Sequence, residues 1–199
     1  MMRNLALCLA VLCLLSSPAL AAIDDAGAAK LKSMFEKLIE FQKASMNINE
    51  GGRLQTDGDV SVEPSGAYYA VTFPYMKVMM PDDARFEIGI ISINAVPHTN
   101  DGEWKMTVAL PTPMVMFDKD GVPKTRIAIG QQQAAGIWSE NLQNFYKLDA
   151  TYQNITASSE IDEITLSLPK ATIRYDFDFD ELGDLSGSGS MSALNSVVN

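Results

Sequence analysis

The chain repeats one short phrase, first as Val71-Thr72-Phe73-Pro74 and later as Val108-Ala109-Leu110-Pro111 and Leu166-Ser167-Leu168-Pro169. Each copy closes an alternating apolar and polar run at a proline, and a second β-prone run follows at residues 75–80, 114–118 and 171–180. Proline has no N–H to give to a ladder, so it occurs at strand ends, edges and bulges. The three phrases therefore predict three places where the chain ends or bends a strand and re-enters the same sheet.

The spacing between the phrases is unequal, since 111 − 74 = 37 and 169 − 111 = 58. A solenoid or a propeller keeps its period, so we predict a meander with one inserted hairpin within residues 130–150. The stretch 130–139 is rich in Gly and Gln, and we interpret it as a loop or an irregular strand. The expected fold is mostly β (α+β), with an N-terminal amphipathic helix packed on a large curved antiparallel meander sheet or half-barrel.

Residues 26–45 have the period of an amphipathic helix. The side chains predicted on its apolar face are Leu31, Met34, Phe35, Leu38, Ile39 and Phe41. Asp24 or Asp25 can cap the N-terminus, where a carboxylate also suits the helix dipole, and Gly51-Gly52 ends the helix. Two interpretations stay open: the helix is a permanent part of the core, or it is a movable lid over an apolar groove.

The first 21 residues have the features of a secretory signal. Arg3 supplies the positive charge, residues 5–15 the apolar segment, and Ala19-Leu20-Ala21 the small-residue cleavage site. The apolar segment is shorter than the roughly 20 residues of a membrane span. We therefore expect cleavage at this site, export to a bacterial periplasm and no transmembrane segment in the mature chain. Cys8 and Cys13, the two cysteines of the sequence, both lie in this segment, so no disulfide or thiol site is expected.

The expected organisation is a signal peptide at residues 1–21, a helix and linker at 22–52, a β-meander domain at 53–181 and a tail at 182–199. The tail is rich in Gly and Ser, which predicts a linker or a frayed end. Its last residues begin another apolar run, so we expect the polypeptide to continue. The mature chain has 14 basic and 25 acidic side chains, a balance of 14 − 25 = −11. Such an acidic protein repels phosphate backbones, and nucleic acid is not an expected partner.

No residue pattern predicts a catalytic, cofactor or metal site, and we expect a protein that is not an enzyme. The sole histidine, His98, falls in a polar loop beside Asp101 and is expected to be exposed to solvent. It is not accompanied by a nucleophile motif such as Gly-x-Ser-x-Gly. Asp176, Asp178 and Asp180 alternate with aromatic residues, but Glu and Gly are not in the order that a calcium loop requires. A solvated acidic strand face is our interpretation, with a loose cation site as the alternative.

Methionine and aromatic residues are abundant on the predicted sheet, in excess of what one short helix would cover. Soft sulfur ligands bind Cu(I), but methionine is also a flexible filler of apolar interiors, and we interpret these side chains as core or groove lining. A hydrophobic-ligand groove is therefore predicted, lined by Phe35, Leu38, Tyr75, Met79, Trp104, Met106, Met114, Met116 and Trp138.

The layout resembles a known architecture. A signal peptide, an amphipathic helix at 26–45 and an opening strand pair at 58–62 and 66–74 are similar to lipoprotein-carrier and related envelope proteins. Those proteins are unclosed half-barrels with a helical lid that hold acyl chains. The later proline-punctuated meander, with residues 121–138, is more similar to uncharacterised alphaproteobacterial envelope proteins of the AsmA-like repeat-β group, which is linked to outer-membrane lipid homeostasis. The resemblance covers about residues 26–180 and implies a lipid-related role.

Two functions are consistent with these features. The first is that of a non-enzymatic periplasmic protein whose concave apolar face binds a lipid, an acyl chain or another hydrophobic partner in envelope maintenance. The second is that of a structural or protein-interaction domain of a longer envelope protein, with no small-molecule ligand, whose edge strands meet a partner.

Overall fold

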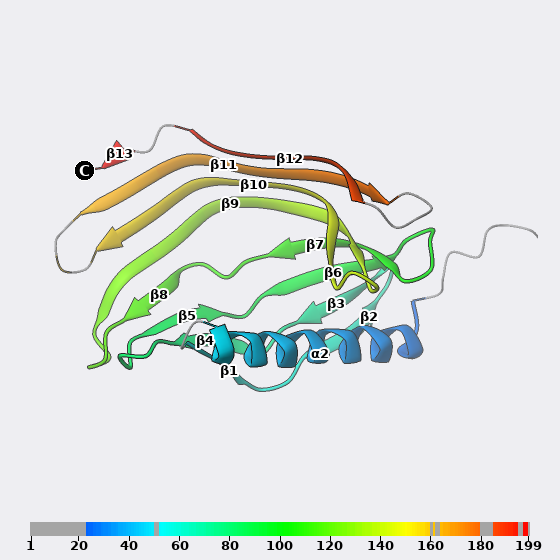
Figure 1. Ribbon diagram of the computed structural model, residues 1–199, viewed down its shortest axis with the longest axis horizontal. Coiled ribbons are helices and arrows are strands. Elements are labelled where there is room, and N and C mark those ends of the chain that lie inside the picture. The colour runs from blue at the N-terminus through cyan, green and yellow to red at the C-terminus, as the bar shows by residue number, and fades with distance from the viewer. Residues whose placement is uncertain are drawn as a thin grey trace, which may run out of the picture.

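The computed structural model describes residues 23–49, 52–159, 161, 164–179, 185–194 and 197–198 of the chain. The predicted signal segment lies outside these residues, as do Gly51 and Asp180. Within them the fold is mostly β, and one helix packs against a curled antiparallel half-barrel sheet (Figure 1). This confirms the fold class predicted from the sequence.

Four long strands in the first half of the chain are each interrupted near the middle, so that each consists of two short strands. The pairs are β1 (Arg53–Asp57) and β2 (Ser61–Ser65), β3 (Tyr68–Thr72) and β4 (Tyr75–Met79), β5 (Arg85–Gly89) and β6 (Ser92–Pro97), and β7 (Glu103–Ala109) and β8 (Met114–Phe117). Two of the interruptions contain Phe73-Pro74 and Leu110-Pro111. The prediction for the first two proline phrases is therefore confirmed.

The second half continues the meander with longer strands: β9 (Pro123–Ser139), β10 (Asn144–Ser159), β11 (Thr165–Phe179), β12 (Leu185–Leu194) and the short β13 (Val197–Val198). β9 joins the two parts of the sheet, because its first half pairs with β8 and its second half with β7. From β9 the order is β8-β5-β4-β1 on one side and β7-β6-β3-β2 on the other. β10, β11 and β12 follow in chain order, and β13 continues the line of β12 along β11.

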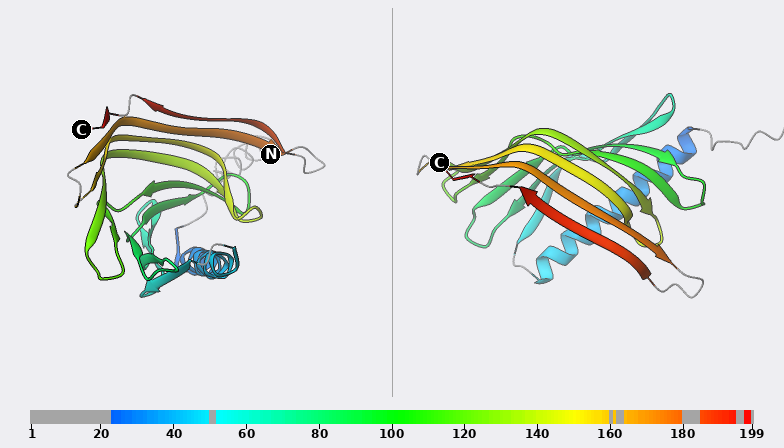
Figure 2. Two further views of the ribbon diagram at one scale, coloured as in Figure 1. Left: turned by 60° about the vertical axis from the view of Figure 1, so that its left-hand side comes forward. Right: turned by 90° about the horizontal axis from the view of Figure 1, so that it is seen from above.

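The interruptions line up across the sheet as one transverse crease. In the long strands the crease passes Gly130, Asn154 and Pro169, the positions at which the ladder skips a pair. Asn154 has φ 53, a left-handed conformation that Asn adopts more readily than most residues. Between β7 and β8 the Gln132 side chain donates to the Leu110 carbonyl at 2.7 Å and accepts from its N–H at 2.8 Å, in place of ladder bonds. The crease lets a single sheet curl around the helix (Figure 2).

Two segments differ from the expectations, and a third decides between two stated alternatives. β11 continues through Leu168-Pro169, because Pro169 lies opposite Asn154 at the skipped position, where the ladder needs no N–H. Residues 130–139 belong to β9, so of the two alternatives stated for this stretch the strand is confirmed and the loop is wrong. A side chain at Gly136 would collide with the Lys147 carbonyl, so this glycine permits close packing of strands and does not mark a turn. The predicted tail contains β12, in which Ser alternates with Gly, Met and Ala.

Helix α2 (Asp25–Asn49) starts where the sequence predicts. Asp24 caps it, since its Oδ1 accepts a hydrogen bond from the Gly27 N–H at 2.8 Å. The side chains that it buries against the sheet, each at most 7% exposed, are Ala28, Leu31, Phe35 and Ile39. Phe41, which is predicted on the same face, is 60% exposed. Six residues at about 100° each place it about 120° from Phe35, and this explains the difference.

The core lies between α2 and the strands of the first half of the chain, together with the end of β9. The sheet contributes Val60, Tyr69, Val71, Phe73, Met76, Ile93, Ala95, Trp104, Met106 and Trp138. The Phe35 ring meets the Phe73 ring edge-on with 5.0 Å between centroids, and it lies 6.3 Å from the Trp138 ring. This packing favours the helix as a part of the core over the helix as a lid.

Candidate functional site

One transverse row of residues shows how the covering of the sheet changes from strand to strand. From β3 to β12 it consists, in register, of Tyr69, Ala95, Met106, Gly136, Leu148, Tyr175 and Gly189. Opposite residues of an antiparallel ladder point to the same side, so the whole row lies on the face that carries the core. The first three residues are at most 1% exposed, the next three are half-buried, and Gly189 is exposed. The helix therefore seals one half of this face and leaves the other half uncovered (Figure 2).

The uncovered half carries a set of large apolar side chains on β10, β11 and β12, which we call the open wall: Leu148, Tyr152, Ile173, Tyr175, Phe177 and Met191. Their register places all six on the helix side of the sheet. Met191 is 80% exposed and the other five are half-buried. The rings of Tyr175 and Phe177 stack with their centroids 5.6 Å apart. The open wall is thus a set of apolar side chains on one face that extends to the last long strand.

The open wall is apolar because the polar residues of these strands point to the opposite face. On β11, Asp176 and Asp178 alternate with the aromatic residues, and on β12 serine occupies every second position from 186 to 192. Lys147 Nζ lies 2.8 Å from an Asp176 oxygen and 3.1 Å from an Asp178 oxygen, and Arg174 pairs with Asp149 at 3.0 Å. One face of β10–β12 is therefore charged and hydrated, and the other is apolar.

Small residues separate the large side chains of the open wall. Gly136 lies opposite Leu148, and the β12 glycines Gly187 and Gly189 lie opposite Phe177 and Tyr175. A Cβ atom built at Gly187 would be 2.8 Å from Cδ1 of Phe177, so the ring lies over this glycine. Burial raises the pKa of the Tyr175 hydroxyl above its ordinary value, as it does for Tyr152, which indicates apolar surroundings on both strands. The glycines leave room between the large side chains, and an extended apolar chain can lie there.

One side of the helix carries Lys30 followed by three apolar side chains. Lys30, Met34, Leu38 and Phe41 follow one another at spacings of three and four residues, which places them on one side of α2. This side faces the β9–β10 turn, because Lys30 Nζ lies 2.9 Å from Glu140 Oε1. Met34 and Leu38 are half-buried and Phe41 is exposed. Met34 and Leu38 pack against the closed core, so Phe41 is the exposed apolar side chain on this side of the helix.

The nine residues predicted to line a groove lie in three separate places. Those in or against the closed core are Phe35, Leu38, Trp104, Met106 and Trp138. Met79, Met114 and Met116 are half-buried on β4 and β8. Tyr75 is 37% exposed on β4. The structure does not bring these nine residues together in one groove.

Tyr75 belongs to a polar cluster on the sheet surface. Its hydroxyl donates to Glu87 Oε2 at 2.6 Å, and Arg85 Nε lies 2.8 Å from the other carboxylate oxygen. The hydrogen bond to Glu87 raises the pKa of Tyr75 to about 12, and the same bond, with that from Arg85, lowers the pKa of Glu87. These groups stabilise β4 against β5 and do not form part of an apolar surface.

The open wall could be found only in part from the sequence. Alternation on β10 places Leu148, Ala150 and Tyr152 on one face, and it also predicts Tyr146 there. A bulge at Tyr146 shifts the register, and its hydroxyl instead bonds to Glu103. Met191 falls in the predicted tail, where the regular Ser alternation is the signal that identifies a strand.

The face of the sheet opposite the core has two adjoining hollows that share Ala135 and Gly136. The first, about 480 Å³, is mainly apolar and includes Tyr68, Val96, Lys105 and Ile137. The second, about 540 Å³, is lined by the charged pairs of β10 and β11 and by serines of β12. Most of their lining residues alternate with those of the open wall along the strands and so lie on the other face, although Leu148 and Tyr175 also border the second hollow.

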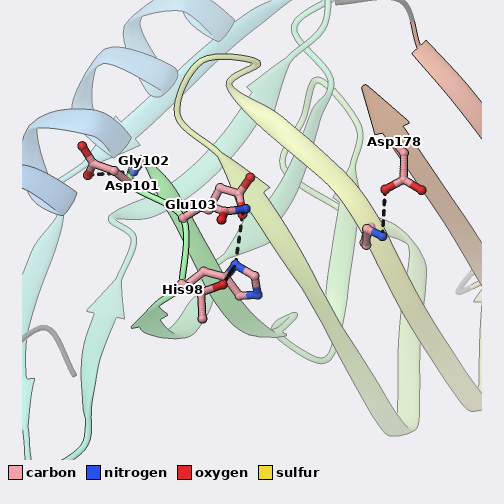
Figure 3. A network of polar contacts seen from close by, with 8 residues as sticks. His98, Asp101, Gly102, Glu103 and Asp178 are labelled. Carbon is pink, nitrogen blue, oxygen red and sulfur yellow. Dashed lines mark hydrogen bonds and ion pairs between the residues drawn. The ribbon is translucent and has the colours of Figure 1, made fainter. Parts of the chain in front are cut away.

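His98 lies in a polar network at the loop between β6 and β7 (Figure 3). Its Nδ1 is 3.0 Å from Glu103 Oε2 and 3.2 Å from Thr99 Oγ1. The side chain is 17% exposed, so it is more buried than expected for a loop histidine, and its acidic partner is Glu103 and not Asp101. Both partners approach the same ring nitrogen. The ring therefore cannot transfer a proton from Thr99 to Glu103 through its two nitrogens, as a catalytic histidine does.

The acidic residues of β11 bind a cation of the protein itself. Lys147 contacts both Asp176 and Asp178, and these ion pairs raise the pKa of its ammonium group. Over the described residues, no group of three or more His, Cys, Asp or Glu side chains is placed to hold a metal ion. Trp138 Nε1 is buried and has no hydrogen-bond partner within the same residues.

Comparison of the chain with protein-family models, with curated proteins and with solved structures found no match. In the part of the chain that the structure describes, no helix has the length and apolar character needed to cross a membrane. The fold and the site together define the class of this protein. It is a helix-filled antiparallel half-barrel whose inner apolar face is half sealed and half open.

Proposed function

We propose that this protein is a non-enzymatic binding protein that holds an elongated apolar ligand, of the acyl-chain class, on the open wall. The observation that carries the proposal is the single inner row in which Met106 is sealed under the helix while Leu148 and Tyr175 are not. Exposed contiguous apolar surface is costly in water and commonly marks a binding surface. The resemblance to lipoprotein-carrier and AsmA-like envelope proteins supports a lipid-related ligand and a role in the periplasm.

The expected affinity follows from the shape of the surface. An acyl chain gains about 0.8 kcal/mol for each CH₂ group that is fully buried. The open wall covers one side of the chain, so roughly half of this gain applies to about 14 CH₂ groups, or about 5–6 kcal/mol in all. Binding is therefore expected with a Kd on the order of 100 µM, and it becomes tighter when the other side of the ligand is also covered.

The experiment is a titration of the purified protein with a fluorescent long-chain fatty acid. Ile173→Glu places a carboxylate on the open wall, whereas Ile137→Glu makes the same change in the apolar hollow of the opposite face. We expect saturable binding that Ile173→Glu reduces at least about tenfold, because an anionic side chain would be desolvated by the ligand, and that Ile137→Glu leaves unchanged. The absence of saturable binding, or a loss caused by Ile137→Glu alone, would refute the proposal.

A structural or protein-interaction domain is the second candidate. The closed core under α2 favours it, because the helix-covered half of the face is filled by the protein's own side chains, among them Phe35, Trp104 and Met106. In that case the open wall would be covered by a protein, and native mass spectrometry of the gently purified protein would show no bound lipid. For the proposed export, the mature protein recovered from the periplasmic fraction is expected to begin at Ala22.

A further inference from the structure

We propose that β12 is a dimerisation edge, at which two copies of this chain pair antiparallel and join their sheets into one. In the described part of the chain β12 pairs with β11 on one side and with no strand on the other. The inference concerns the edge of the sheet and does not depend on ligand binding by the open wall.

The two boundaries of the sheet differ in how they are protected. An exposed strand edge is normally blunted by charged residues, by proline or by a covering element. The far boundary has all of these: Arg53 and Asp57 on β1, Glu63 and Pro64 on β2, and helix α2 packed against both strands. β12 is longer, with ten residues, and its sequence LSGSGSMSAL contains neither a charge nor a proline. An edge without these protections fits a strand partner.

Charge permits a second copy as that partner at this edge and opposes it elsewhere on the surface. The chain has a formal net charge of −10, so two copies repel one another over most of their surfaces. β12 is neutral along its whole length, so two copies of it meet without like-charge contacts across the new ladder. Its outward positions are serines except for the terminal Leu194, and from Gly187 on its inward positions are small except for Met191, which lets the strands approach to ladder distance.

The symmetry of the pairing gives a specific fit. In an antiparallel pair of identical strands, the two-fold axis lies either at a residue that pairs with its own copy or between two successive residues. Only the first arrangement keeps the inner faces of both copies on the same side of the joined sheet. Centred pairing then places the axis at Gly189 or at Ser190. Met191 lies opposite Gly187 of the second copy in the first case and opposite Gly189 in the second. In both, the large inner side chain of one strand meets a glycine of the other, and the two open walls become one surface.

The test is the mass of the purified full-length protein by light scattering over a concentration range on the order of hundredfold. We expect a dimer that dissociates in the micromolar range, since a one-strand interface is smaller than the roughly 1,600 Å² of a standard one. Met191→Lys adds an inward-pointing charge at an 80% exposed position and should give a monomer of unchanged thermal stability. Leu142→Lys makes the same type of change at the exposed β9–β10 turn and should leave the dimer intact.

A crosslink tests the geometry. With Cys8 and Cys13 replaced by serine, either Gly189→Cys or Ser190→Cys is expected to form a disulfide dimer under mild oxidation, because the residue on the axis meets its own copy. Leu142→Cys is expected to stay monomeric. A wild-type protein that is monomeric over the whole range, a dimer that Met191→Lys does not dissociate, or open-ended polymers in place of a dimer would overturn the proposal.

Discussion

Truncation of Phe35 tests whether α2 is a fixed part of the core. The ring is 2% exposed and contacts the rings of Phe73 and Trp138. A Phe→Ala change at such a site costs about 3–5 kcal/mol, and this value includes about 0.5–1.5 kcal/mol for each aromatic pair. Domains of this kind are stable by about 5–15 kcal/mol in total. Phe35→Ala is therefore expected to remain folded in water with much of its stability lost.

Phe41→Ala is the matched control on the same helix. The side chain is 60% exposed, so we expect its loss to change the free energy of unfolding by less than about 0.5 kcal/mol. The gain in helix propensity is the same for both substitutions and cancels in the comparison. Urea unfolding followed by the fluorescence of Trp104 and Trp138 measures both values. A helix that opens as a lid would make the two variants nearly equal, and costs within about 1 kcal/mol of one another would refute the packed-helix account.

Three further predictions concern polar contacts that hold the helix and the strands. Gly27→Ala should destabilise the protein by about 1–3 kcal/mol, because a Cβ there collides with the Tyr69 hydroxyl. The same change should cost less in a Tyr69→Phe background, and thermal melts of the single and double variants measure the difference. Glu140→Ala should cost about 1–3 kcal/mol by leaving the Trp104 N–H unpaired, and Glu140→Gln, which keeps an acceptor, should cost clearly less in urea unfolding; equal costs would contradict this role. Glu87 has a lowered pKa, so its contribution to stability is present above the ordinary value of 4.5 and is lost as pH falls below it. Glu87→Gln should therefore lose less stability than the wild type between about pH 6 and about pH 3 in urea unfolding, and an equal loss would show that the pair with Tyr75 and Arg85 is not linked to folding.

The sequence predicts the class of fold because local patterns dictate it. Period-two alternation and two proline phrases mark interrupted strands, and the 3.6-residue period and Asp24 mark the helix. Pro169 carries the same phrase without ending its strand, since its effect depends on Asn154 in the neighbouring strand. Such a pairing is a tertiary property that the phrase itself does not contain.

The site is less predictable, for a related reason. The sequence identifies side chains that are apolar, such as Met106 and Tyr175, but not which of them the helix covers. Both lie in one row of one face, and only the position of α2 on the early strands separates a sealed residue from an open one. Glycine adds to the difficulty, because Gly187 and Gly189 suit a linker as well as a strand that packs under Phe177.

Cysteine reactivity measures the difference between the two halves of this row directly. With Cys8 and Cys13 replaced by serine, Tyr175→Cys and Met106→Cys are each treated with a maleimide in the native state. The cysteine at 175 is expected to react in the native state without unfolding, and added fatty acid is expected to slow its reaction. The cysteine at 106 should react more slowly by a factor on the order of 10³ or more, because it is reached only by unfolding. If both cysteines react slowly, the open wall is closed as well. If both react quickly, the helix does not seal the core.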